Sequence, residues 1–193
     1  MKIGIIGKGN VGSALAAGLS RNGHEIKFGR SDPKEPVSEA AKWGEVIILA
    51  VPHKAAGNAT KAIGSAADGK PVIDVSNALT ENLEWAMGFT TSAAEEIQKM
   101  LPKAYVVKAF NTVFAQNQST GKIGEERLAL FVAGDDAKAK QTVMQLGKDI
   151  GFDPVDAGPL KSARYLEPMG MLMINLGYPL GMGPKIGLKL VRG

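Results

Sequence analysis

The segment from residue 7 to residue 12 is the part of the sequence best suited to bind phosphate. It reads Gly-Lys-Gly-Asn-Val-Gly and lies between a short apolar run and a stretch with helical spacing of apolar residues. In that context the first glycine permits a tight turn, the second lets backbone N–H groups approach a pyrophosphate, and the third lets the helix pack on the strand. The start of the helix adds unpaired N–H groups. We therefore expect a dinucleotide cofactor to contact Gly7, Lys8, Gly9, Asn10 and Val11.

The residues that follow the second expected strand, 25–28, favour NADP(H) over NAD(H). NAD-dependent enzymes place an acidic residue at this point to bind the ribose hydroxyls. Here the chain has Arg30 and Ser31, and a guanidinium and a hydroxyl suit a 2′-phosphate instead. Asp32 lies further out, before a proline, and is interpreted as a turn residue. We expect the phosphate to be bound by Arg30 and Ser31, with further positive charge from Lys8 and Lys34.

The carboxyl ends of the next strands should line the same crevice, as in other open α/β sheets. The third strand ends near Ala50 and Val51, which we expect to offer backbone contacts to the cofactor. His53 follows, and it is either a residue that stacks near the cofactor or a surface or capping residue. Asn77 follows the fourth strand, at the height of the nicotinamide ribose.

No pair of residues in the sequence has the spacing needed for acid–base catalysis. Tyr105 and Lys108 are three apart on an expected strand, so they point to opposite faces and cannot form the Tyr-Lys pair of short-chain dehydrogenases. Lys108 and Asn111 end the fifth strand, where they either orient a ligand or hold the loop by hydrogen bonds to its backbone groups. Asp74 lies inside the fourth strand and is expected to be structural. Hydride transfer between two ring cofactors needs no proton shuttle from the protein. We therefore predict no catalytic side chain and no metal site.

Strand and helix patterns alternate along the chain, which predicts a Rossmann-type α/β fold. The short, wholly apolar strands indicate a doubly wound parallel sheet buried on both faces. Residues 1–157 are expected to form the dinucleotide-binding domain, and residues 158–193 a short helical appendage. The expected strands are 3–6, 25–28, 46–51, 71–75, 105–110, 128–133 and 152–156, and the helices 10–22, 54–66, 92–100 and 136–150.

The composition excludes several classes of protein. The chain has 193 residues, a net charge of +4 and no cysteine, so disulfides, thiolate nucleophiles and cysteine-ligated metal sites are ruled out. The basic residues are scattered, which argues against a nucleic-acid groove. There is no secretory leader pattern and no apolar run of ~18 residues, so we expect a cytoplasmic protein with no membrane partner.

Five segments carry a resemblance to a known family: 7–12, 28–31, 132–136, 156–160 and 181–190. In these the sequence resembles the NADPH-dependent coenzyme F420 reductases. That resemblance implies a homodimer that moves a hydride between NADP(H) and a deazaflavin, whose ring lies over the nicotinamide against the C-terminal segment. Most of the methionines and other apolar residues between 169 and 176 are interpreted as a helix packed in a dimer core. Some of the methionines between residues 169 and 182, Met182 among them, would in addition form an adaptable wall for the flat ring.

Other functions stay open because the sequence departs from the archaeal members of that family. Residues 111–114 read Asn-Thr-Val-Phe where those enzymes have a His-Thr-Ile-Pro type of segment. The run Lys-Ala-Phe-Asn-Thr at 108–112 recurs in bacterial relatives and in membrane metalloreductases that pass NADPH electrons to a flavin. The acceptor is therefore F420, FMN, FAD or another small oxidant. Pyrroline-5-carboxylate reductases share the N-terminal domain type but need a longer helical domain, and a non-catalytic NADPH sensor is the remaining alternative.

Overall fold

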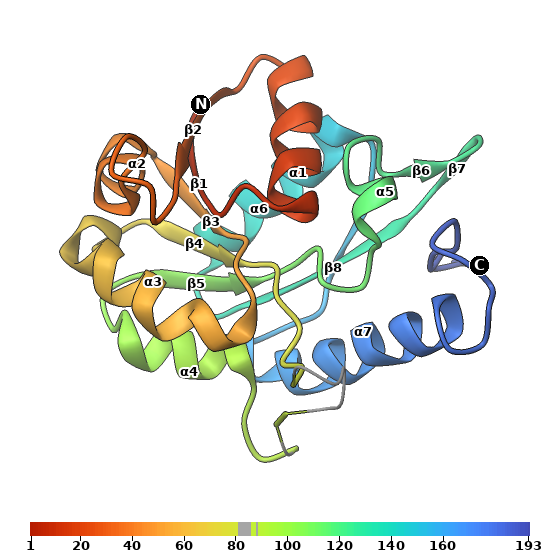
Figure 1. Cartoon of the computed structure of the whole chain (residues 1–193). Helices are drawn as coiled ribbons and strands as arrows, with labels where there is room; N and C mark the ends of the chain where they lie inside the picture. The colour runs from red at the N-terminus through yellow and green to blue at the C-terminus, as the bar shows by residue number, and fades with distance from the viewer. Residues whose placement is uncertain (81–85, 88) are drawn as a thin grey trace.

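A seven-stranded sheet forms the centre of the molecule in the computed structural model, which describes residues 1–80, 86–87 and 89–193 (Figure 1). The strand order is β2-β1-β3-β4-β5-β8-β9, and the first five of these strands run parallel. This arrangement confirms the predicted Rossmann-type fold. The strands are β1 Lys2–Ile6, β2 Glu25–Gly29, β3 Val46–Leu49, β4 Pro71–Asp74, β5 Tyr105–Lys108, β8 Ala129–Gly134 and β9 Asp153–Asp156.

Helices cover both faces of the sheet, because successive strand residues point to opposite sides. Ile5 packs in one core cluster with Leu15 of α1 and Val143 of α6. Ile47 packs in the other with residues of α2, α3 and α4, and Figure 1 shows the two layers. The helices are α1 Asn10–Arg21, α2 Val37–Trp43, α3 Ala56–Ile63, α4 Ala93–Met100, α5 Ala115–Gln118, α6 Ala137–Ile150 and α7 Ala163–Gly177, with short 3-10 turns at His53–Ala55, Gly64–Ala67 and Leu160–Ser162.

The prediction of a wholly parallel sheet was wrong at β8. This strand runs antiparallel to β5, with Lys108 opposite Ala133. A parallel neighbour needs a crossover that returns the chain to the amino ends of the strands. Here the chain stays at the carboxyl end of β5, where it forms α5 and the hairpin of β6 (Lys122–Ile123) and β7 (Glu126–Arg127), and then re-enters the sheet.

The chain leaves β5 earlier than the sequence predicts. Phe110 adopts a φ of 66°, the one positive value for a non-glycine among the described residues. A bulky residue in the left-handed region costs on the order of 1–3 kcal/mol and persists only where packing holds it. Phe110 is fully buried and packs edge-on against Phe152, with ring centroids 5.7 Å apart. This turn points the next residue, Asn111, away from the sheet toward α7.

The C-terminal segment follows β9 and places α7 along one end of the molecule (Figure 1). Pro168 lies inside this helix. After α7 the tail returns to the sheet, where the backbone N–H of Ala129 donates to the Leu188 carbonyl at 2.8 Å. Over the described part of the chain, no helix is long and apolar enough to cross a membrane.

Candidate dinucleotide site and acceptor pocket

The glycine loop has the geometry that the sequence predicts for its first and third glycines. Gly7 has a φ of 103°, and a Cβ there would clash with the Ala50 carbonyl oxygen. A Cβ on Gly12 would clash with the Gly7 carbonyl oxygen, so α1 can approach β1 only with glycine at this position. Gly9 differs, because a Cβ there would meet no atom within 4 Å. The space beside Gly9, at the start of α1, is therefore open, which fits the close approach of a phosphate to backbone N–H groups.

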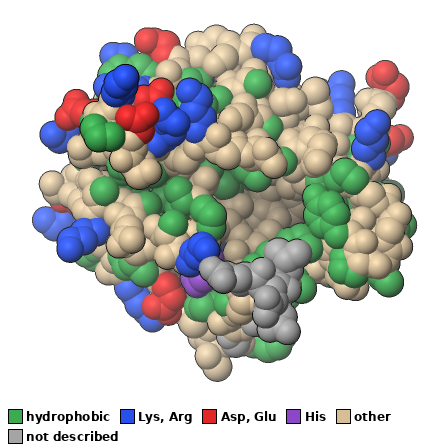
Figure 2. Space-filling view, viewed as in Figure 1, with side chains coloured by type: hydrophobic (Ala, Val, Ile, Leu, Met, Phe, Trp, Pro, Cys, Tyr) green, Lys and Arg blue, Asp and Glu red, His purple; other side chains and the backbone are tan. Residues whose placement is uncertain are grey.

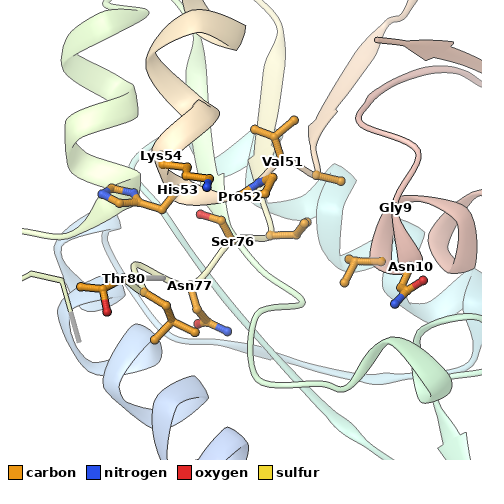
Figure 3. A pocket seen from close by; sticks show the side chains of 13 residues that line it. Gly9, Asn10, Val51, Pro52, His53, Lys54, Ser76, Asn77 and Thr80 are labelled. Carbon is orange, nitrogen blue, oxygen red and sulfur yellow. The ribbon is translucent and has the colours of Figure 1, made fainter. Parts of the chain in front are cut away.

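Three hollows follow one another along the carboxyl edge of the sheet. The basic-loop hollow lies between the glycine loop, the end of β2 and α3, and has Gly7, Lys8, Arg30 and Ser31 in its lining. The central hollow comes next and shares Val51 with it (Figures 2 and 3). The central hollow is lined by Gly9, Asn10, Val11, Ala50, Val51, Pro52, His53, Lys54, Val75, Ser76, Asn77, Leu79 and Thr80.

The third or asparagine hollow lies between the start of α1, the segment after β5, and α7. It has a volume of about 240 Å³ and shares Asn10, Val11 and Asn77 with the central hollow. Asn111 joins Asn77 in its lining, and α7 contributes Gly170, Met173 and Ile174. Most of the cofactor-binding residues expected from the sequence therefore line these three neighbouring hollows.

Lys34 and Met182 do not take part in that row. The side chain of Lys34 is exposed, and its backbone N–H donates to Asp32 Oδ1 at 2.9 Å in an Asx-type turn. Met182 is 60% exposed and lines a separate hollow between α7, the β6–β7 hairpin and the tail. Only Met173 lines both that tail hollow and the asparagine hollow. The structure therefore separates Met182 from the other expected cofactor residues.

His53 is in the central hollow, on the far side from Gly9 and Asn10 (Figure 3). Its Nδ1 is buried and has no hydrogen-bond partner among the described residues. The nearby Ser76 hydroxyl is in the same situation. Both groups thus retain unused hydrogen-bonding capacity at the wall of the hollow.

A surface charge cluster surrounds Arg30 at the mouth of the basic-loop hollow. Arg30 donates through Nε to Glu35 and through Nη2 to Asp32 Oδ2 at 2.9 Å. Lys8 Nζ lies 3.6 Å from the other Glu35 oxygen and also stands over the Phe28 ring. These bonds use two of the five guanidinium N–H donors, so Arg30 can still bind a phosphate, but beside two carboxylates. Figure 2 shows this mixed group of basic and acidic side chains near α2.

A buried charge cluster lies behind the central hollow. Lys108 Nζ donates to Asp74 Oδ2 at 2.8 Å and to the Ser76 carbonyl at 2.5 Å, and lies 3.1 Å from Glu167 Oε1. All three charged side chains are fully buried. Burial by itself lowers the pKa of Lys108, but attraction by Asp74 and Glu167 outweighs it and raises that pKa above the ordinary lysine value. In this structure the Lys108 side chain therefore joins the end of β4 to α7 through Asp74, Ser76 and Glu167.

Glu167 extends this cluster to two helices. It belongs to α7, and its carboxylate accepts the backbone N–H groups of Ala93 at 3.0 Å and Ala94 at 3.2 Å, at the start of α4. A carboxylate is favoured at that position because a helix N-terminus has unpaired donors and a positive dipole end. On the same two helices, Arg164 forms a bidentate pair with Glu95 at 2.7 and 2.9 Å. The Arg164 guanidinium lowers the pKa of Glu95.

Asn77 and Asn111 form a reciprocal pair at the boundary of the two inner hollows. Asn111 Nδ2 donates to Asn77 Oδ1 at 3.0 Å and to the Leu166 carbonyl at 2.7 Å, and Asn77 Nδ2 donates to the Asn111 carbonyl at 2.9 Å. A Cβ on Gly170 would clash with Asn77 Oδ1, so α7 packs directly on this pair. Both asparagines thus connect the strand ends to α7.

Sequence reasoning missed Glu35 and Glu167 as parts of these clusters. Glu35 follows a proline in a loop, where a charged residue carries no structural signal of its own. Glu167 is more conspicuous, because it is the one acidic residue between Ala163 and Gly177, a helix otherwise rich in apolar side chains. Buried carboxylates occur where cations or N–H donors compensate them. A single glutamate in an otherwise apolar helix therefore indicated a buried charge with partners elsewhere in the fold. No group of three or more His, Asp or Glu suited to a metal ion occurs among the residues that the structure describes.

The fold and the glycine loop define the class as a Rossmann-type dinucleotide-binding domain. Residues 2–78 match the family model described as NADP oxidoreductase, coenzyme F420-dependent. The chain is also 27% identical over 207 residues to an F420-dependent NADP reductase of Methanocaldococcus jannaschii, covering 91% of this chain and 92% of that protein. A crystal structure of a proposed F420-dependent NADP reductase from Arthrobacter superposes with a TM-score of 0.92 at 29% identity, and each chain is covered completely. These matches confirm the family resemblance seen in the sequence.

A second group of relatives consists of metalloreductases. The rat metalloreductase STEAP3 is 30% identical to this chain over 185 residues, which cover 90% of the chain. The match covers only 37% of the metalloreductase itself, so the chain corresponds to one part of that longer protein. The resemblance noted at residues 108–112 therefore extends over most of the sequence.

Proposed function

We propose that this chain transfers a hydride between NADP(H) and a deazaflavin such as coenzyme F420, or a related flavin. The observation that supports this most is the shared lining of the three hollows. With the pyrophosphate at the start of α1 and the 2′-phosphate near Arg30, the nicotinamide end of the cofactor would reach the central hollow. The asparagine hollow, which shares Asn10, Val11 and Asn77 with it, then remains for the acceptor ring.

The residues present fit a bound NADP(H). The open side of Gly9 and the N–H groups at the start of α1 suit the pyrophosphate. Arg30 and Ser31, with Lys8, provide charge and a hydroxyl for the 2′-phosphate. Lys34, exposed on the same loop, remains part of this proposal as a further source of positive charge.

The lining of the central and asparagine hollows supports a reaction in which the protein mainly holds the two ligands in position. Among the described residues, no aspartate or glutamate lines the central or the asparagine hollow. Bound NADPH supplies the hydride, and the chain's own side chains orient the two ligands and exclude water. Asn77 and Asn111 are the polar residues best placed to orient them, while Met173 and Ile174 form an apolar wall.

A second candidate acceptor is a flavin, with onward reduction of a metal. The similarity to metalloreductases over 90% of the chain supports it. Both candidates use the same NADP(H) site and differ only in which ring enters the asparagine hollow.

We further propose that residues 158–193 form both the acceptor wall and a homodimer contact. Five large apolar or aromatic side chains on α7 and the turn that follows it are more than half exposed, namely Tyr165, Leu172, Tyr178, Leu180 and Met182. A second copy of the chain would cover them. Met182, remote from the central hollow, would then contact an acceptor only if the tail hollow takes part of that ligand. The cytoplasmic location expected from the sequence belongs to this proposal.

The test of the reaction is NADPH oxidation under anaerobic conditions, with coenzyme F420, FMN, FAD and riboflavin offered in parallel and NADH as the control donor. Turnover with F420 alone supports deazaflavin reduction. Turnover with flavins alone supports the second candidate. No turnover with any acceptor, combined with tight NADPH binding, would overturn both and favour a non-catalytic NADPH sensor. The dimer is tested by sedimentation of the wild-type chain and of Leu172→Asp, which should be monomeric.

A further inference from the structure

The buried charge cluster, defined by Asp74, Lys108 and Glu167, has a feature that stability alone does not require. Its central ammonium contacts Ser76 and Glu167, and each of these lies in a segment whose neighbouring residues line the asparagine hollow. Lys108 has three N–H donors, and three acceptors surround it: the Asp74 carboxylate, the Ser76 carbonyl and the Glu167 carboxylate.

One wall is fixed through Ser76. Its carbonyl accepts from Lys108 at 2.5 Å, and its N–H donates to Asp74 Oδ1 at 2.9 Å. Both backbone groups of Ser76 are therefore held by the same ion pair. The next residue is Asn77, which lines both inner hollows, so the cluster determines where that side chain stands.

The other wall is fixed through α7. Glu167 joins Lys108 on the sheet to the start of α4, and the adjacent Leu166 carbonyl accepts from Asn111. One turn further along, Gly170 packs directly on Asn77 Oδ1. The residues of α7 that line the asparagine hollow, Met173 and Ile174, follow on the same helix.

We propose that Lys108 is a positioning residue that sets the spacing between Asn77 and α7, and thereby the placement of the acceptor ring against the nicotinamide. The consequence for turnover rests on the proposed function. Reacting atoms must lie about 3–3.5 Å apart for hydride transfer, and a displacement near 1 Å can cost on the order of 100-fold in rate. In the proposed function the phosphates of NADP(H) bind in the basic-loop hollow, and none of Asp74, Lys108 and Glu167 lines that hollow.

The test compares Glu167→Gln with Arg164→Gln. Both variants remove one charged contact between α7 and α4, but only Glu167 also contacts Lys108. For Glu167→Gln we expect kcat with the preferred acceptor to fall at least tenfold while the Kd of NADPH changes less than twofold. Arg164→Gln should leave both values near those of the wild type. Gly170→Ala, which leaves every charge in place but displaces α7 from Asn77, should reproduce the loss of kcat.

A second readout does not depend on turnover. The side-chain amide NMR signals of Asn77 and Asn111 report their hydrogen bonds directly. They should shift in Glu167→Gln and stay in place in Arg164→Gln. Unchanged signals and unchanged kcat in a folded Glu167→Gln would overturn the positioning role. If the wild type reduces no acceptor, the proposed function fails, and these amide signals still decide whether the cluster positions Asn77.

Discussion

The two charge clusters of this chain contain the same chemical groups in opposite surroundings. The surface cluster of Lys8, Arg30, Asp32 and Glu35 has side chains 32–44% exposed. The buried cluster of Asp74, Lys108 and Glu167 is 0% exposed. Water screens the first, so its pairs are weak and can exchange for a ligand phosphate. The second has no such alternative, because losing one partner leaves a buried charge uncompensated. The surface ions are therefore accessible to a ligand, whereas the buried ions fix the positions of the segments that carry them.

The largest expected effect is on stability, from Lys108→Met. Two buried carboxylates would lose their shared cation, and we expect the free energy of unfolding to fall by about 3–5 kcal/mol. Denaturant unfolding measures it. The matched change in the surface cluster, Arg30→Met, should cost no more than about 1 kcal/mol. Equal losses in the two variants would remove the distinction between the clusters.

The next effect concerns cofactor choice, from Arg30→Ala. A charge-assisted bond to the 2′-phosphate contributes on the order of 2 kcal/mol, so the Kd of NADPH should rise by roughly 30-fold while that of NADH changes little. Fluorescence titration with each nucleotide measures both. A parallel weakening of the two nucleotides would show that Arg30 does not bind the 2′-phosphate.

An intermediate effect is expected for the half-buried pair of Glu95 and Arg164. The pKa of Glu95 is lowered in the folded state by the hydrogen bond from Arg164, so its stabilising contribution is complete above the unfolded value of 4.5 and is lost as pH falls through the lower folded value. Glu95→Gln should therefore lose up to about 1 kcal/mol at neutral pH. At pH values below the folded pKa of Glu95, the variant and the wild type should have the same free energy of unfolding. A constant difference across the whole pH range would contradict this assignment.

The smallest effect is expected from Glu35→Gln in the surface cluster. Removing this carboxylate frees Arg30 Nε and reduces repulsion of the phosphate, so NADPH should bind up to about 5-fold more tightly. The gain should shrink as salt rises, because exposed charges are screened. Titrations at two ionic strengths measure it. Weaker binding in the variant would mean that Glu35 serves mainly to orient Arg30.

The sequence was sufficient for features that depend on neighbouring residues. The glycine loop, the seven strands of the sheet and the strand ends that line the hollows are local patterns, and the structure confirms them. The helices α2 and α5 and the β6–β7 hairpin were not predicted. Strand direction was not predictable in the same way, since the apolar pattern of β8 is the same in either direction. Glu167 reaches Lys108 only once α7 packs on the sheet. The left-handed turn at Phe110 likewise depends on packing against Phe152, which no local pattern encodes.

The reversed strand β8 also has a consequence for how such a protein diversifies. The segment between β5 and β8 leaves and re-enters the sheet at the same edge. The strand pairs β1–β2, β1–β3 and β3–β4 lie outside this segment, which instead packs on α1, where Arg21 donates to the Ser119 carbonyl. Chimeras that swap this segment between relatives should change the accepted electron carrier and keep the nicotinamide cofactor. Under the proposed function, acceptor choice then depends on a segment that is separate in sequence from the glycine loop.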